Sequence, residues 1–209
     1  MSSQSEPREV PPTAITLAGF LIPAEYWDNP DRVEVLVAPD GFVARLPKQE
    51  IPLLEYLSVP HLLDDFQHWL TDHDYDDDTV DGLIADQLAV VYTLDDDARA
   101  LDAFTGLRIV GMCGPVLSAD KYPEVVWVAH DPSTGGEVLI TSLLADIMWS
   151  SLPDEDIPTA AARLAGKWSV PDNLRGRFFF EGLTSLLGQK LARLEWLVNP
   201  GPHPENTLS

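Results

Sequence analysis

The densest group of residues that could bind a metal ion is a run of aspartates in the first half of the chain. Six aspartates lie between positions 72 and 81, and Asp72, Asp74 and Asp76 match the first, third and fifth positions of a calcium loop. Such a loop also needs glycine at its sixth position and glutamate at its twelfth, where this chain has Asp77 and Leu83. The spacing therefore favours a solvated acidic face over a calcium site.

Three histidines near this run are the next candidates for metal chemistry. His61, His68 and His73 lie close in sequence to Asp64 and Asp65. On one helix, the seven residues from His61 to His68 span about 10 Å, which is too far for one ion. We expect ordinary surface histidines and no metal site.

The remaining reactive residue types form no recognisable constellation. Cys113 lies near Gly111 and Gly114 with no histidine close in the sequence, so we expect a small buried hydrophobic residue and not a nucleophile. Gly135 and Gly136 fit a hairpin turn and not a phosphate-binding loop. We therefore expect no cofactor and no enzymatic activity.

Composition limits the classes of partner. The 209 residues carry a formal net charge of −21, and 45% are hydrophobic, which is enough for a real core. The charge argues against binding to nucleic acid phosphates or anionic membranes, and it suits either a basic protein surface or a plain solvated face. A single cysteine and an N-terminus without an apolar segment predict a cytoplasmic protein.

The pattern of apolar residues predicts alternating strands and helices. Strands are expected at 15–23, 33–38, 42–46 and 89–94, with helices near 51–57, 60–70 and 79–88. In the second half, strands are expected at 107–117, 125–130 and 137–141, with helices at 142–152, 157–168 and 171–191. We expect disordered ends at 1–13 and 199–209, modules at 14–94 and 107–198, and a linker at 95–106 that holds a helical turn.

The two halves follow one plan. A shift of 95 residues aligns Gly19 with Gly114, Gly41 with Gly136, and Leu57 with Leu152, and a shift of 100 aligns Asp81-Gly82-Leu83 with Glu181-Gly182-Leu183. The order of element types repeats as well. The sequence therefore predicts an α+β protein of two tandem winged-helix-like modules, each a three-stranded antiparallel sheet followed by three helices; a single mixed domain is the alternative.

The second half resembles the PqqD-like family, the recognition elements that bind the leaders of ribosomally made, modified peptides. The resemblance covers about 107–196 and rests on the hairpin, the segments LLADIMWSSL and DIPTAAARLA, and a long third helix. The sequence departs from the family at the entry to the first helix, which reads Ile140-Thr141-Ser142. The first half is more divergent.

The resemblance implies a site for an added peptide strand. The peptide would pair with the edge of the hairpin and pack against the third helix. The groove would be lined by Val138, Ile140, Phe179, Phe180, Leu183 and Leu187, with Arg175 and Arg177 pairing acidic residues of the peptide. The alternative is that these apolar residues are core, although three consecutive phenylalanines, 178 to 180, cannot all face inward on one helix.

The resulting expectation is an adaptor that binds a leader peptide and a peptide-modifying enzyme, with the acidic run of the first half docking a basic partner. A winged-helix transcription regulator is the first alternative, and its recognition helix would use Arg175, Arg177, Lys190 and Arg193. An acidic mimic of DNA is the second.

Overall fold

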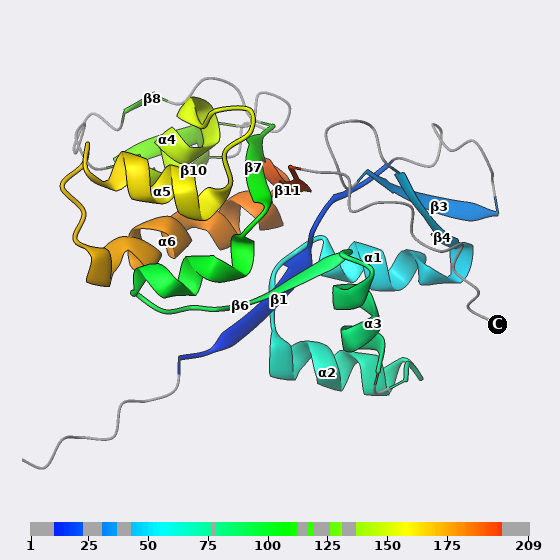
Figure 1. Cartoon of the computed structure of the whole chain (residues 1–209). Helices are drawn as coiled ribbons and strands as arrows, with labels where there is room; N and C mark the ends of the chain where they lie inside the picture. Colours follow the sequence, from blue (N-terminus) through cyan, green and yellow to red (C-terminus); the bar gives the residue numbers. More distant parts are fainter. Residues whose placement is uncertain are drawn as a thin grey trace, which may run out of the picture.

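The computed structural model describes residues 11–22, 31–36, 43–76, 78–112, 117–118, 126–130 and 137–197. Over these residues the chain is a mixed α+β protein with small antiparallel sheets (Figure 1). The predicted tail at 199–209 and the turn at 39–41 lie outside them, as do Cys113, Gly135 and Gly136. No helix among the described residues is long and apolar enough to cross a bilayer.

The first half runs from the first strand to a strand that returns to pair with it. Its strands are β1 (Thr13–Leu17), β2 (Phe20–Leu21), β3 (Arg32–Leu36), β4 (Val43–Pro47), β5 (His61–Leu62) and β6 (Ala89–Thr93). Its helices are the 3-10 turn η2 (Lys48–Glu50), α1 (Ile51–Leu57), α2 (Leu63–Asp72) and α3 (Thr79–Ala85).

The second half follows after the 3-10 helix η3 (Ala98–Phe104), which is the helical turn expected in the linker. Its strands are β7 (Leu107–Gly111), β8 (Leu117–Ser118), β9 (Val126–His130), β10 (Glu137–Thr141) and β11 (Ala192–Trp196). Its helices are α4 (Ser142–Ser150), α5 (Ile157–Ala165), the 3-10 turn η4 (Asp172–Leu174) and α6 (Arg175–Gly188).

Strand pairing repeats between the halves. In each half the second, third and fourth strands form an antiparallel sheet, in the orders β2-β3-β4 and β8-β9-β10. The first and last strands form a separate antiparallel pair, β1 with β6 and β7 with β11. Apart from β5 and the 3-10 turns, both halves therefore present four strands, three helices and a closing strand in the same order.

The ends of the helices repeat too. The four non-glycine residues with positive φ among the described residues are Asp74, Gln87, Ser169 and Lys190, at 53° to 59°. Each follows the end of a helix, α2, α3, α5 and α6 in turn. In each case the next residue donates its amide to a carbonyl five positions back, as in a glycine-terminated helix end.

Three of the sequence expectations differ from the structure. His61 and Leu62 form a strand on β1 and not a helical turn, because their backbone groups pair with Ala14 and Ile15. Leu62 is therefore exposed and not core. The third helix of the second half ends at Gly188 and not at 191. The sequence interpretation missed the strand that follows, β11, which pairs with β7.

The β1–β6 pair separates two hydrophobic cores. Alternate residues of a strand face opposite sides of its sheet. Ala14, Val90 and Tyr92 join the core formed with the second half, whereas Ile15 and Ala89 join the core beneath α1, α2 and α3. In Figure 1 this pair of strands runs between the two groups of helices. The two halves therefore share one layer of the fold.

The linker packs into the core of the second half, which is called the second core below. Leu101 and Phe104 of η3 are buried there, and Phe104 packs edge-on to Phe179 with ring centres 5.4 Å apart. The backbone carbonyl of Asp96 accepts a hydrogen bond of 2.6 Å from the amide of Gly176 at the start of α6. The segment that leads from one half to the other is thus fixed at both its helix and its loop.

An ion pair between Arg163 of α5 and Glu155, which precedes α5, lies beside the end of α4. Glu155 is buried and accepts bonds of 2.7 and 2.6 Å from the guanidinium of Arg163, which also donates to the carbonyl of Ser150. Hydrogen bonding from Arg163 lowers the pKa of Glu155 below its ordinary value of 4.5. Because the folded-state pKa is depressed, the stabilisation is complete above pH 4.5 and is lost as the pH falls through the folded pKa.

We expect the Arg163→Met variant to be less stable than the wild type at pH 7, since it leaves the carboxylate of Glu155 without its ion-pair partner. The loss should shrink below pH 4.5, where the pair no longer contributes. Thermal melts from pH 3 to pH 7 measure it. Arg99→Met is the matched control, because the pair with Asp97 is exposed and should contribute little at any pH. A constant difference across this range would contradict the assignment.

Candidate binding site

The apolar residues of the predicted peptide groove lie inside the second core. Val138, Ile140, Phe179, Leu183 and Leu187 are all buried. The side chains of β10 that face outward are those of Glu137 and Leu139, and Leu139 is 64% exposed. Val138 and Ile140 are therefore covered by α6. This is the arrangement expected if these residues belong to the core.

Helix α6 lies directly against β10. The helix is interrupted at Glu181 and Gly182, where the backbone leaves helical geometry and Gly182 takes φ +95°. A Cβ atom on Gly182 would lie 2.7 Å from Cγ2 of Ile140 and 2.9 Å from the carbonyl oxygen of Leu139. Only glycine lets the helix backbone lie directly against the strand.

The other three predicted residues are engaged within the chain. Arg175 pairs with Asp172, and Arg177 pairs with Glu181 at 2.8 Å. Phe180 is half buried, with its ring stacked 5.6 Å from that of Tyr92. Of the three phenylalanines, Phe179 alone is fully buried, and Phe178 and Phe180 pack at the edge of the core.

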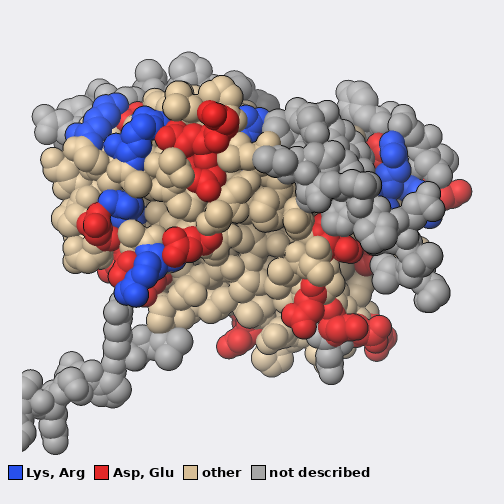
Figure 2. All heavy atoms as spheres, viewed as in Figure 1, with Lys and Arg blue, Asp and Glu red and all other residues tan. Residues whose placement is uncertain are grey.

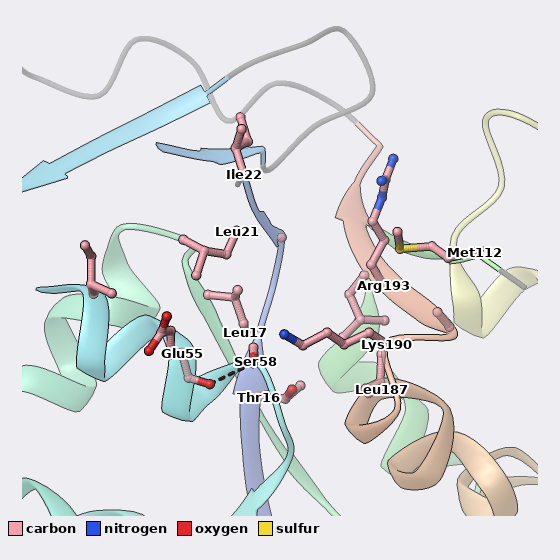
Figure 3. A pocket seen from close by; sticks show the side chains of 14 residues that line it. Thr16, Leu17, Leu21, Ile22, Glu55, Ser58, Met112, Leu187, Lys190 and Arg193 are labelled. Carbon is pink, nitrogen blue, oxygen red and sulfur yellow. Dashed lines mark hydrogen bonds between the residues drawn. The ribbon is translucent and has the colours of Figure 1, made fainter. Parts of the chain in front are cut away.

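A cavity of about 480 Å³ lies between the two halves instead (Figure 3). The end of β1 forms its floor, and the end of β2 with the following residue, Ile22, forms its upper edge. Helix α1 forms one wall, and the end of α6 with β11 forms the other. Most of its lining is apolar. The lining residues are Thr16, Leu17, Gly19, Leu21, Ile22, Ile51, Glu55, Ser58, Met112, Leu187, Lys190, Ala192, Arg193 and Leu194. Leu187 is the predicted site residue that lines this cavity.

The charged residues of the cavity differ in whether they already form an ion pair within the protein. Arg193 binds Glu195 at 2.7 Å, and Glu195 is buried between Arg193 and Arg108. Lys190 extends from the end of α6 across the cavity towards α1, where Glu55 and Ser58 lie (Figure 3). No carboxylate of the described residues forms an ion pair with Lys190.

The backbone at Lys190 is unusual for a residue with a side chain. Lys190 has φ +57° and occupies the first position after the C-terminal cap of α6. Its amide donates to the carbonyl of Leu187, and the amide of Leu191 donates to that of Leu186. Glycine is the usual residue at this position, because a Cβ costs about 1–2 kcal/mol in the left-handed region.

The three histidines of the first half lie on β5, on α2 and at the end of α2. Among the described residues, no group of three or more His, Cys, Asp or Glu side chains could hold an ion. His61 lies on β5 and stacks on Tyr56 at 3.8 Å, while the ring nitrogens of His68 and His73 bond to backbone carbonyls. Figure 2 shows acidic side chains gathered over the α2–α3 end, whereas Lys and Arg are interspersed with acids over the second half.

Comparisons with known proteins gave no match: no family model, no curated protein and no solved structure matches this chain.

Lys190 was not among the predicted peptide-binding residues. A shift of 103 residues aligns Gln87-Leu88-Ala89 with Lys190-Leu191-Ala192. Of the first segment, Ala89 was correctly predicted to begin a strand, whereas Gln87 and Leu88 were predicted as the end of a helix. Carrying the strand start at Ala89 into the second half places a strand from Ala192, where β11 begins.

Proposed function

We propose that this protein is a non-enzymatic, cytoplasmic adaptor that binds an extended peptide segment, with an apolar side chain of the peptide inserted between the two halves. The observation that carries the proposal is the apolar cavity with an unpaired lysine at its edge. Its volume falls within the range of ligand pockets, and its lining of apolar residues with a few polar groups is typical of them. Buried anchor residues of this kind supply most of the affinity in peptide complexes.

The most specific form of the proposal is recognition of the leader of a ribosomally made peptide. It rests on the resemblance of the second half to the PqqD-like family and on two tandem winged-helix-like modules. The repeated strand pairings support the tandem arrangement. The peptide would occupy the cavity between the modules and not the groove expected from the family. The exposed acidic residues between α2 and α3 would face a basic surface of the modifying enzyme.

The charges of the second half favour a protein ligand over DNA. Arg175, Arg177 and Arg193, which would contact phosphates in a DNA reader, are paired with Asp172, Glu181 and Glu195. A DNA-binding surface needs cations that are free to replace counterions. The DNA-binding alternative would require all three intramolecular pairs to break.

Selection from a random peptide library tests the proposal directly. The bait is the full chain, and the comparison bait is Ser58→Trp, which places a large ring in the cavity from a half-buried position on its wall. We expect peptides with an apolar residue beside Asp or Glu to be enriched by the wild type and not by the variant. Equal enrichment on both baits, or salt-sensitive binding to duplex DNA, would refute the proposal.

A further inference from the structure

We propose that Lys190 is the specificity-determining residue of the cavity and that it binds an anionic group attached to an apolar body, in a peptide the carboxylate of an Asp or Glu beside the anchor residue. This inference rests on the proposed function and adds the chemistry that the cavity selects. Three independent observations support it. The backbone at Lys190 is strained, its ammonium has no ion-pair partner among the described residues, and Glu55 lies on the facing wall of the cavity.

The backbone conformation at position 190 is one that disfavours any residue with a side chain. Lys190 sits where glycine would be more stable, at φ +57° after the end of α6. Residues held in sparsely populated backbone regions occur preferentially at functional sites. Asp74, Gln87 and Ser169 share this conformation but do not line the cavity. The strain alone therefore does not identify a binding residue, and Lys190 differs from the other three in being both strained and part of the cavity lining.

The two cations of the cavity are not equivalent. The guanidinium of Arg193 is held by the buried carboxylate of Glu195 at 2.7 Å, so binding a ligand anion would compete with that pair. The ammonium of Lys190 has no such pair among the described residues and extends into the cavity (Figure 3). Lys190 is therefore the group available to form a charge-assisted hydrogen bond with a ligand.

The facing wall fixes the orientation of the ligand. Glu55 lines the cavity from α1, opposite the end of α6 (Figure 3). An anion placed near Glu55 would be repelled, whereas the same anion near Lys190 would be attracted. The protein as a whole carries −21, but at physiological ionic strength charges beyond about 8 Å are largely screened, so the nearest groups decide the selectivity.

Two fluorescent probes of the same skeleton separate charge from apolar binding. The first, 8-anilinonaphthalene-1-sulfonate, has an apolar body and an anionic group; the second, N-phenyl-1-naphthylamine, has nearly the same body and no charge. For the full chain we expect the anionic probe to bind about tenfold more tightly than the neutral one, as a charge-assisted hydrogen bond allows. Ser58→Trp should weaken both probes.

Variants at position 190 then test the residue. We expect Lys190→Gly to weaken the anionic probe about tenfold, to leave the neutral probe within twofold, and to raise Tm by about 2 °C through relief of backbone strain. Lys190→Met should weaken the anionic probe equally without raising Tm. Ser169→Gly, which relieves the same strain at the end of α5 outside the cavity, should raise Tm and leave both probes unchanged.

The outcomes distinguish this inference from the proposed function. If neither probe binds, or if Ser58→Trp changes neither, the cavity is not a binding site and the proposed function fails. If both probes bind and respond to Ser58→Trp but Lys190→Gly leaves the anionic probe unchanged, the inference about Lys190 fails alone. Tighter binding of the anionic probe to Glu55→Gln is expected, and weaker binding would overturn the proposed orientation.

Discussion

The Gly176→Ala variant is expected to lose about 4 kcal/mol of folding stability, a large part of the 5–15 kcal/mol that holds a typical domain. An added Cβ would lie 2.2 Å from the carbonyl oxygen of Asp95, 2.6 Å from that of Asp97 and 2.8 Å from that of Asp96. All three obstacles are backbone atoms, so no side-chain rotation can relieve them. The linker or the helix must move.

The contact that an alanine at position 176 would disrupt also fixes the linker to α6. The amides of Gly176 and Arg177 both donate to the carbonyl of Asp96, at the N-terminal end of the helix where amides have no partner within the helix. Moving the linker would break these bonds and disturb the packing of η3, which buries Leu101 and Phe104. The penalty therefore exceeds that of a simple steric overlap.

Urea unfolding followed by circular dichroism measures this effect. Gly166→Ala is the control, because Gly166 is exposed, has helical φ and ψ, and its Cβ would meet only one backbone oxygen, at 3.9 Å. That variant should be neutral or slightly more stable than the wild type. A loss under 1 kcal/mol for Gly176→Ala would show that the linker does not lie against α6 as described.

The Gly182→Ala variant is expected to lose about 3 kcal/mol, because it combines two penalties. A residue with a Cβ is strained at φ +95°, and the Cβ would lie 2.7 Å from Cγ2 of Ile140 and 3.1 Å from its Cα. The variant must push α6 away from β10. It therefore tests directly whether the groove expected from the family resemblance is closed.

Gly82→Ala is the matched control, since Asp81-Gly82-Leu83 is the counterpart of Glu181-Gly182-Leu183. A Cβ on Gly82 meets nothing within 4 Å and the residue is exposed on α3, so alanine should stabilise that helix by up to about 1 kcal/mol. Opposite signs at the two glycines are the expected result of chemical denaturation. Equal and small effects would mean that α6 stands off from β10.

Local sequence patterns were sufficient to predict most of the elements. The alternating or β-branched segments of β6, β9 and β10 were placed within one or two residues, and so were the starts of α1, α4 and α5. Strands β6 and β10 and the three helices bury residues at the spacing that their own geometry requires. A helical turn was also predicted within the linker, where η3 lies.

Long-range pairing was beyond the local patterns. Whether His61 and Leu62 continue a helix or pair with β1 depends on a partner nearly fifty residues away, and the β7–β11 pair joins the two ends of the second half. The candidate site depended on such contacts. Val138 and Ile140 alternate as an edge strand should, but their exposure is decided by the approach of α6, which a single glycine permits.

The pair of strands shared by the two cores limits how the sequence of either half can change. Neighbouring residues of β1 and β6 are constrained by different halves: Ala14 and Val90 by one core, Ile15 and Ala89 by the other. A protein shortened to its second half would lose Ala14, Ala18, Val90 and Tyr92 from the core it retains. The two halves are thus not separable parts, and substitutions along this pair of strands in one half must be accommodated by packing in the other.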